Sequence, residues 1–214
     1  ANIEDTTTHE YAQQQFDRFE KMLGMLADFG LNPKYRHCEN SAAVILFPHT
    51  HLDFVRPGIA NYGMWPSRET FVTAKEQKRA IELKPVLEWK TRVAEVKRIP
   101  KGSTISYGRT FETKRDSVVA VLPIGYSNGF PRSLSNHAHV LIGGEMAPIA
   151  GRVMMNMVVV DVTDILDVKV EDEVVIIGRQ GNKRITAEDV AALEGTINYE
   201  TTTMISPATP RVVV

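Results

Sequence analysis

The sequence predicts an α/β part followed by an all-β part, because its pattern of apolar residues changes near residue 85. Before that point, helical patterns alternate with short strand patterns, which is typical of βα units and a parallel sheet. After that point, short strands follow one another closely and Gly-containing turns separate them, which favours an antiparallel barrel or sandwich. A chain of 214 residues is long enough to form both parts.

The first part begins with an amphipathic helix over residues 9–29, in which apolar residues recur every three or four positions. Gly30 then provides a helix stop, because glycine readily adopts the left-handed conformation that ends many helices. Two short strands and two short helical segments should follow in alternation, at residues 35–38, 41–47, 52–55 and 58–64.

The second part begins with alternating apolar and polar residues over 87–93, as in a half-buried strand. The alternation slips after Ala94, so we expect a β-bulge there. Only residues 186–193 have a helical pattern in this part. Further short strands are expected at residues 104–107, 117–122, 139–142, 147–150, 158–162, 173–177 and 211–214. We place the domain boundary in a linker over residues 69–83, so the predicted domains are residues 1–83 and 84–214.

Composition and charge exclude several classes of function. The net charge is −1, and no long basic or acidic block occurs, which argues against nucleic acid or an anionic membrane as a partner. No apolar run approaches the length of a transmembrane helix. The single cysteine excludes an internal disulfide and favours a reducing, cytoplasmic environment. No cluster of cysteine and histidine has zinc-binding spacing, so no metal site is predicted.

The stretch 123–132 is the most informative one for chemistry. It follows the apolar residues 118–122 and carries Tyr126 between Gly125 and Gly129. Glycine permits close backbone approach, so such a turn can present one phenol in a cleft. A phenol held beside a cation can transfer protons. The alternative interpretation is an ordinary turn with an exposed tyrosine.

Two residue pairs, Asn40-Ser41 and Gly58-Ile59, each follow a predicted strand and open a helical segment. The first turn of a helix presents free backbone N–H groups and the positive end of its dipole, so it can hold a phosphate group. The alternative is ordinary capping, with Ser41 as the N-cap and Gly58 as a turn glycine.

Five stretches resemble, in order, motifs of the alanine racemases of fold-type III, which depend on pyridoxal phosphate, and the resemblance covers nearly the whole chain. They are His37-Cys38-Glu39-Asn40-Ser41-Ala42-Ala43, residues 55–63, Pro123-Ile124-Gly125-Tyr126-Ser127-Asn128-Gly129, Val153-Met154-Met155-Asn156 and Ile197-Asn198-Tyr199-Glu200. The resemblance implies the remnant of a (β/α)8 barrel followed by a mainly antiparallel, β-barrel-like domain.

The resemblance also implies roles for individual residues. Tyr126 is the acid/base on one face of the substrate, and the backbone N–H of Met155 contacts the substrate carboxylate. Arg56 hydrogen-bonds the pyridine nitrogen of the cofactor. The residues implied in phosphate binding are Asn40, Ser41, Gly58, Ile59 and Tyr199. Asn156 replaces the aspartate that is usual in the family, which removes a negative charge near the substrate entrance.

By this resemblance the protein is a homodimeric isomerase that interconverts L- and D-alanine, a peptidoglycan precursor, by two-base proton transfer. Each active site would join the barrel of one subunit to the β domain of the other. The family's Lys-Ala-Asn-Ala-Tyr-Gly motif, whose lysine attaches the cofactor, is not found in these 214 residues. We therefore expect the isolated chain to be inactive. Two alternatives stay open: a non-catalytic β module for self-association, and a racemase for another small amino acid.

Overall fold

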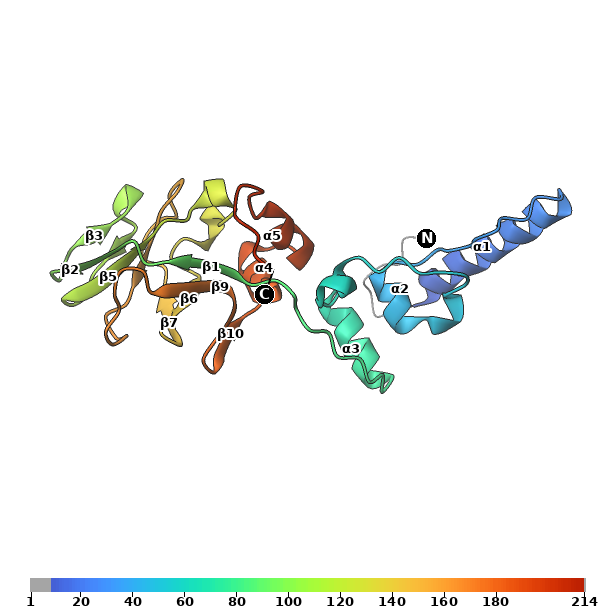
Figure 1. Ribbon diagram of the computed structural model, residues 1–214, viewed down its shortest axis with the longest axis horizontal. Helices are drawn as coiled ribbons and strands as arrows, with labels where there is room; N and C mark the ends of the chain where they lie inside the picture. The colour runs from blue at the N-terminus through green and yellow to red at the C-terminus, as the bar shows by residue number, and fades with distance from the viewer. Residues whose placement is uncertain (1–8, 214) are drawn as a thin grey trace. The chain divides into compact units, whose positions relative to one another are not determined.

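The computed structural model describes residues 9–213, and the chain divides into two compact units between Val86 and Leu87 (Figure 1). The described part of the first unit is helical, and the second is built mainly from β-strands. No helix among residues 9–213 combines the length and apolar character that crossing a membrane requires.

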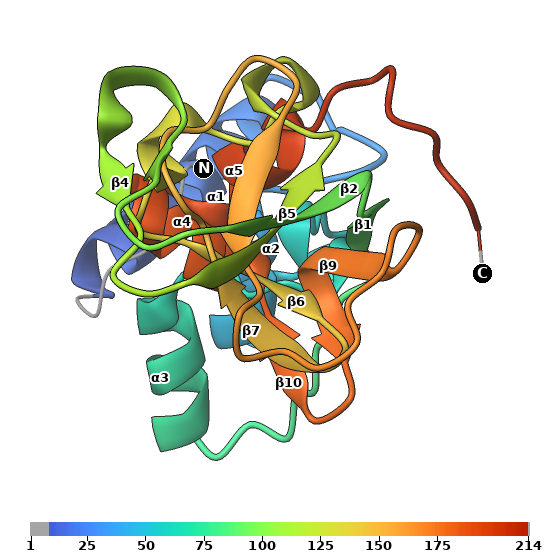
Figure 2. The ribbon, with the colours of Figure 1, turned by 90° about the vertical axis from the view of Figure 1, so that its left-hand side faces the viewer.

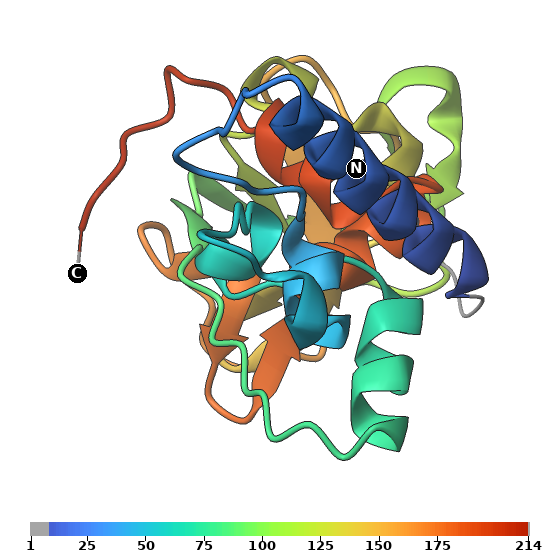
Figure 3. The ribbon, with the colours of Figure 1, turned by 90° about the vertical axis from the view of Figure 1, so that its right-hand side faces the viewer.

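Between residues 9 and 86, three α-helices and two short 3₁₀-helices make up the regular structure of the first unit (Figure 3). The predicted long helix is confirmed as α1, and the first predicted short helix is confirmed as α2. A small apolar cluster joins α1, α2 and α3 through Ala12, Ala43, Ile45, Leu46, Phe47 and Ala74. The elements are α1 (Glu10–Asp28), α2 (Ser41–Leu46), η1 (Pro48–Thr50), η2 (Ile59–Tyr62) and α3 (Arg68–Glu76).

The two strands predicted in this unit, at residues 35–38 and 52–55, are not formed. The two segments do lie side by side, because Asp53 N donates to the Arg36 carbonyl (3.2 Å) and Phe54 packs on His37 with a centroid distance of 4.3 Å. One backbone hydrogen bond does not make a ladder. A strand of a parallel sheet needs partners along its length, and residues 9–86 contain no other strand to supply them.

The segment predicted as a linker is also partly helical, which corrects the assignment of residues 69–83. Helix α3 starts after Ser67, whose side chain accepts a hydrogen bond from Thr70 N at 3.0 Å. Thr73 and Ala74 are buried. The helix is short and its buried face is largely threonine, so it lacks the apolar periodicity by which a helix is recognised in sequence.

The second unit contains ten strands, and all of their pairings are antiparallel, which confirms the predicted character of this part. The larger sheet has the order β1-β9-β6-β7, with β10 also paired to β9; a second has the order β2-β5-β8, and β3 pairs with β4 (Figure 2). The strands are β1 (Trp89–Arg92), β2 (Glu95–Ile99), β3 (Thr104–Ile105), β4 (Phe111–Glu112), β5 (Ser117–Leu122), β6 (His139–Ile142), β7 (Glu145–Pro148), β8 (Val158–Asp161), β9 (Glu173–Gln180) and β10 (Lys183–Ile185).

The two larger sheets are joined at both ends. A bridge between Ile149 and Val160 links β7 to β8. At the other end the chain passes from β1 directly into β2: Val93 N donates to the Asp172 carbonyl, and Ala94 N donates to the Val121 carbonyl. One isolated bridge and the continuous chain from β1 to β2 thus connect the two sheets, which remain separate sheets and not a closed barrel. The irregularity at Ala94 is a change of sheet rather than the bulge we predicted, since the pairing partner itself changes there.

Three further sequence predictions are corrected in this unit. The predicted helix is present as α4 (Ala187–Glu194), but it is not the only one, because α5 (Asn198–Met204) follows it. The chain turns into the 3₁₀-helix η3 (Tyr107–Arg109) after β3, which shortens the strand predicted there. Residues 211–213 form no strand and extend away from the sheets, although the Arg211 guanidinium donates to the Thr209 carbonyl, and residue 214 lies outside the described residues (Figure 2).

Candidate active site

The Ser41 side chain links two helix N-termini in the first unit. Its hydroxyl oxygen accepts hydrogen bonds from Gly58 N at 2.8 Å and from Ala60 N at 3.3 Å. Asn40 caps α2, since its Oδ1 accepts from Ala43 N at 3.1 Å. The N-cap is therefore Asn40 and not Ser41, because the serine is already the first helical residue. The structure brings the predicted residues Asn40, Ser41, Gly58 and Ile59 together.

The donors of this cluster suit an anionic oxygen. Two backbone N–H groups donate to the Ser41 oxygen, and a phosphate oxygen, an acceptor of the same kind, could share or replace it as their acceptor. Gly58 is exposed, and a Cβ added there would have only Ser41 Oγ near it, at 3.9 Å. The absence of a side chain at Gly58 thus leaves the approach to these donors open. These observations fit a phosphate group held between α2 and η2.

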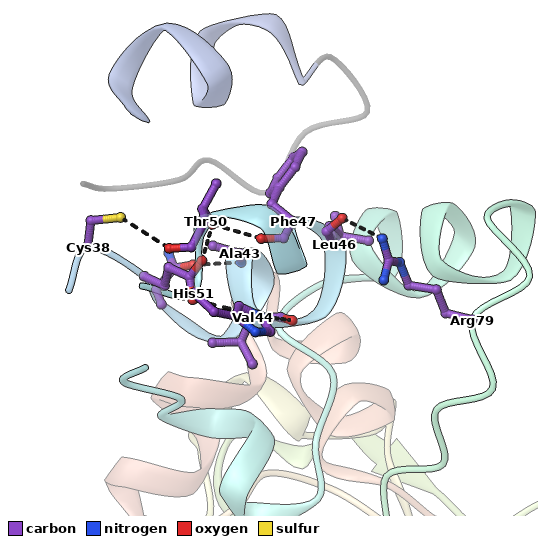
Figure 4. A network of polar contacts seen from close by, with 10 residues as sticks. Cys38, Ala43, Val44, Leu46, Phe47, Thr50, His51 and Arg79 are labelled. Carbon is purple, nitrogen blue, oxygen red and sulfur yellow. Dashed lines mark hydrogen bonds and ion pairs between the residues drawn. The ribbon is translucent and has the colours of Figure 1, made fainter. Parts of the chain in front are cut away.

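Helix α2 is held in place by hydrogen bonds to its C-terminal carbonyls (Figure 4). The Val44 carbonyl is contacted by the ring of His51 (3.1 Å), and the Leu46 carbonyl accepts from the guanidinium of Arg79 (3.0 Å). The hydroxyl of Thr50 reaches the Phe47 carbonyl at 2.8 Å. These side chains satisfy groups that a helix end leaves without partners. They also fix the direction in which the N-terminus of α2 points.

Glu39 is a buried carboxylate that sequence reasoning did not single out. It is 0 % exposed and contacts the Thr50 hydroxyl, while its second oxygen has no hydrogen-bond partner among the described residues. Burial raises the pKa of the neighbouring Cys38 thiol, and the charge of Glu39 raises it further. An acidic residue directly before a helix N-cap was the available signal, but its burial depends on Thr50, eleven positions away.

Arg56, the predicted partner of the pyridine nitrogen, is exposed and forms no ion pair with any residue in 9–213. Nearby, Arg36 and Asp53 form an ion pair with a distance of 2.8 Å from Nε to Oδ2. This hydrogen bond lowers the pKa of the Asp53 carboxyl and raises that of Arg36. The pair thus holds the segment that leads to Arg56 next to the segment that leads to Asn40.

In the second unit, Tyr126 begins a 3₁₀ turn, η4 (Tyr126–Asn128), and its side chain is 45 % exposed. The turn is closed by Asn128, whose Oδ1 accepts from Gly125 N at 3.1 Å. It is also attached to a second loop, since Tyr126 N donates to the Met154 carbonyl at 3.1 Å and Ser127 N donates to the Met155 carbonyl at 2.9 Å. The structure therefore brings the predicted residues Tyr126 and Met155 together.

Gly125 makes this contact possible. A Cβ at this position would lie 2.2 Å from the Met154 carbonyl oxygen and 2.6 Å from the Met155 carbonyl carbon. Any side chain would push the two loops apart, since the obstacles are backbone atoms. The Met155 amide donates no hydrogen bond to any of the described residues, and its side chain is 59 % exposed. The backbone of the Tyr126 turn is thus bonded to the loop that carries the open Met155 N–H.

The structure does not unite all the predicted site residues within one unit. Tyr199 lies on α5 in the second unit, whereas the other four predicted phosphate ligands and Arg56 lie in the first. Asn156 is exposed. Among residues 9–213, no group of three or more histidine, cysteine, aspartate or glutamate side chains could hold a metal ion.

Comparison with known families gives two matches that together account for most of the chain. Residues 1–66 match the N-terminal domain of alanine racemase, and residues 86–213 match its C-terminal domain. The alanine racemase of Halothermothrix orenii is 46 % identical over 207 residues, which are 97 % of this chain and 53 % of the relative. That of Clostridium novyi is 44 % identical over 97 % of this chain and 52 % of the relative. The chain thus spans about half the length of the curated relatives it matches.

Solved structures give the same result. A crystal structure of alanine racemase from Bacillus anthracis, with bound L-Ala-P, matches with a TM-score of 0.86 and 38 % identity, over 94 % of this chain and 50 % of that one. The alanine racemase of a Streptomyces lavendulae strain that produces D-cycloserine matches with a TM-score of 0.87 and 37 % identity, over 98 % of this chain and 53 % of that one.

Proposed function

The chain belongs to the alanine racemase family, and we propose that the full-length protein interconverts L- and D-alanine with pyridoxal phosphate as its cofactor. The observation that carries this proposal is the backbone contact between the Tyr126 turn and residues 154–155, which joins an exposed tyrosine to a loop with an open N–H donor for a carboxylate. Racemisation requires such an arrangement, because the substrate must be held while a proton moves at its α-carbon.

The residues of the first unit would hold the cofactor as the remnant of a (β/α)8 barrel. Asn40, Ser41, Gly58 and Ile59 would bind its phosphate group, together with Tyr199 of the second unit. The donors that converge on the Ser41 oxygen support this assignment. Arg56 would donate to the pyridine nitrogen, and its exposed, unpaired guanidinium supports that role. When bound, the cofactor supplies an electron-withdrawing ring that acidifies the α-proton of the amino acid.

Tyr126 would take and return the α-proton on one face of the substrate through its phenolic oxygen. The Met155 N–H would bind the substrate carboxylate, and so keep the α-carbon in reach of the phenol. The base on the other face would be the family's lysine. We also propose a homodimer in which Tyr126 and Met155 serve the cofactor of the partner subunit. The exposure of both side chains supports this arrangement.

The test is Tyr126→Phe in the full-length, cofactor-loaded protein, which removes only the hydroxyl. We expect kcat for racemisation to fall by about 10²–10⁴, the usual contribution of general acid–base catalysis. Cofactor absorbance should be unchanged, and exchange of the α-proton of one enantiomer in D₂O should continue. Tyr11→Phe, on α1 and 48 % exposed, is the matched control and should behave like the unmodified protein. Near-normal racemisation by Tyr126→Phe would refute the assignment.

The 214 residues alone should not racemise alanine, since they do not contain the family's lysine motif. The check is to add pyridoxal phosphate to the purified chain, reduce with borohydride and map the modified lysines. One stoichiometrically labelled lysine together with alanine racemisation would show that this chain holds more of the site than we propose.

A further inference from the structure

We infer that Ser106, Ser135 and Asn136 are positioning residues. They hold the loop of residues 151–155 (the 151–155 loop), so that the Met155 amide stays next to the turn that carries Tyr126. The inference rests on the proposed function for its kinetic consequence, but its structural basis is independent of that function. None of the three residues is among those proposed to contact the substrate. They act through the backbone of the loop that carries the donor.

Three consecutive backbone positions of the loop are each held by a side chain from elsewhere in the second unit. The bonds are Gly151 N to Asn136 Oδ1 at 2.7 Å, Ser106 Oγ to the Arg152 carbonyl at 2.6 Å, and Val153 N to Ser135 Oγ at 3.0 Å. Side chains that bond backbone groups in irregular loops replace the hydrogen bonds that a helix or strand would provide. The loop is thereby fixed although it contains no regular structure.

Two of the three residues adopt a backbone conformation that is uncommon outside glycine. Ser106 and Asn136 both have φ of 63°. Such residues persist where surrounding contacts over-determine them, and they concentrate at functional sites. The amide of Asn136 is oriented by a second bond, from its Nδ2 to Thr110 Oγ1 at 3.2 Å, which turns its oxygen toward Gly151. Two of the three residues that hold the loop therefore adopt this uncommon conformation.

The remaining side of the loop meets the tyrosine turn. The carbonyls of Met154 and Met155 accept from Tyr126 N and Ser127 N, and Ser127 Oγ also donates to the Met155 carbonyl at 2.7 Å. Side chains of Ser106, Ser135 and Asn136 thus hold positions 151–153, and the tyrosine turn holds positions 154–155. The Met155 N–H is left as an open donor whose place is set by all of these bonds. A donor that must meet a carboxylate needs such support, because small misplacements weaken it strongly.

Asn136 gives the sharpest test, because two substitutions separate its hydrogen bond from its backbone conformation. Asn136→Gly removes the acceptor but suits the positive φ. Asn136→Asp keeps an acceptor for Gly151 N and tolerates the positive φ. Asn182→Gly, in the exposed turn between β9 and β10, is the matched control. All variants are made in the full-length, cofactor-loaded protein, and kcat and KM for alanine are measured together with hydrogen exchange of the peptide 150–157.

With Asn136→Gly we expect faster exchange in the peptide 150–157 and a KM for alanine raised about tenfold, which corresponds to about 1.4 kcal/mol of lost binding. We expect kcat to change less than KM, since Tyr126 keeps its hydroxyl. Asn136→Asp should restore both KM and exchange, and Asn182→Gly should change neither. If Asn136 only stabilised the fold, Asn136→Gly would impair kcat and KM alike, and Asn136→Asp would not restore KM selectively.

Unchanged exchange and KM in Asn136→Gly, or equal impairment in Asn136→Asp, would overturn the inference. Ser135→Ala, which removes the bond to Val153 N, is the second variant if Asn136→Gly does not fold, and it should show the same exchange and KM effects. If no form of the protein racemises alanine but Asn136→Gly still accelerates exchange in the loop, the proposed function fails and the positioning role stands.

Discussion

The two units differ in how their backbones find hydrogen-bond partners. In the second unit ten strands pair in antiparallel ladders, and two loops without regular structure are bound to each other by side chains and backbone. In the first unit, residues 35–38 and 52–55 lie side by side with a single backbone hydrogen bond and form no strand. One unit of the chain thus supplies hydrogen-bond partners for its strand-forming segments, and the described part of the other unit does not.

The cores of the units show the same difference. Of the largest side chains that are less than 2 % exposed, all but Glu39 lie in the second unit, among them Leu122 and Val140 at 0 %. The strands of the second unit find their partners within that unit, even where the partners are far apart in sequence, as β1 and β9 are. A strand of a parallel sheet needs partner strands from other βα units, and residues 9–86 contain none. The contrast therefore teaches that a segment forms a strand only where the same unit also contains its partners.

The largest expected effect tests the core of the second unit. Leu122→Ala should lower the free energy of unfolding of that unit by about 2–5 kcal/mol, because it removes a fully buried side chain of β5 and leaves a cavity in the core. The chain has two tryptophans, Trp65 in the first unit and Trp89 in the second. In a Trp65→Phe background, tryptophan fluorescence during urea unfolding therefore reports on the second unit alone. Leu166→Ala, at a position that is 92 % exposed, is the control and should have almost no effect.

The counterpart in the first unit is Leu46→Ala, read by Trp65 in a Trp89→Phe background. Leu46 is 5 % exposed and belongs to a cluster of six buried residues. We expect a smaller loss than for Leu122→Ala, since a small cluster can relax around the missing atoms. Equal losses of unfolding free energy in Leu46→Ala and Leu122→Ala would contradict the view that the core of the first unit is packed less completely.

A smaller effect is expected from glycines at which two backbone segments touch. In Gly129→Ala the new Cβ would meet the Met204 carbonyl oxygen at 2.2 Å, and φ is +94°. We expect a loss of about 1–3 kcal/mol, because α5 is packed and cannot move away. Gly195→Ala has φ of +75° and nothing within 4 Å, so only the conformational cost of about 1 kcal/mol should remain.

The same comparison in the first unit should give a different result. In Gly63→Ala the Cβ would lie 1.8 Å from the Lys84 carbonyl oxygen, but the segment there is attached by one backbone bond, from Val86 N to the Tyr62 carbonyl. We expect it to shift, so that the loss is close to that of the open control Gly30→Ala. A loss larger than that of Gly129→Ala, measured by urea unfolding, would show that the first unit is as rigid as the second.

The smallest expected effect is a difference in the sign of the pH dependence. Burial raises the pKa of Glu194, although a hydrogen bond from Thr201 opposes this. The folded state then binds the proton more tightly than the unfolded state, so this contribution is complete below the ordinary glutamate pKa and is lost as pH rises through the raised value. In the first unit the hydrogen bond from Arg36 lowers the pKa of Asp53, so its contribution is present above the ordinary aspartate pKa and is lost as pH falls.

Acidification should therefore weaken the contribution of Asp53 and strengthen that of Glu194. Glu194→Gln keeps an acceptor for Thr201 and should remove this pH dependence from the Trp89 signal. Asp53→Asn should do the same for the Trp65 signal. The measurement is the urea midpoint of each single-tryptophan chain across the acidic range. Identical pH slopes for a variant and its parent would show that the group titrates alike in the folded and unfolded chain.

Local sequence signals found the parts of the candidate site that depend on adjacent residues. The turn at Tyr126 was predicted from its flanking glycines, and Asn128 closes it within four residues. Asn40-Ser41 was predicted to open a helix, and it does. Residues that act across long stretches of chain were missed, among them Glu39, Ser106 and Asn136, because a serine or asparagine in a polar loop has no pattern that distinguishes it.

By itself the sequence determined the amphipathic helix α1, the apolar strands of the second unit and the glycine turns between them, since each depends on residues close in the chain. Only the tertiary structure decided which strands pair in each sheet, that residues 35–38 and 52–55 form no ladder, and that Gly151 meets Asn136. These outcomes depend on partners far apart in sequence, and one sequence pattern is compatible with several such partners until the backbone hydrogen bonds and the core are satisfied together.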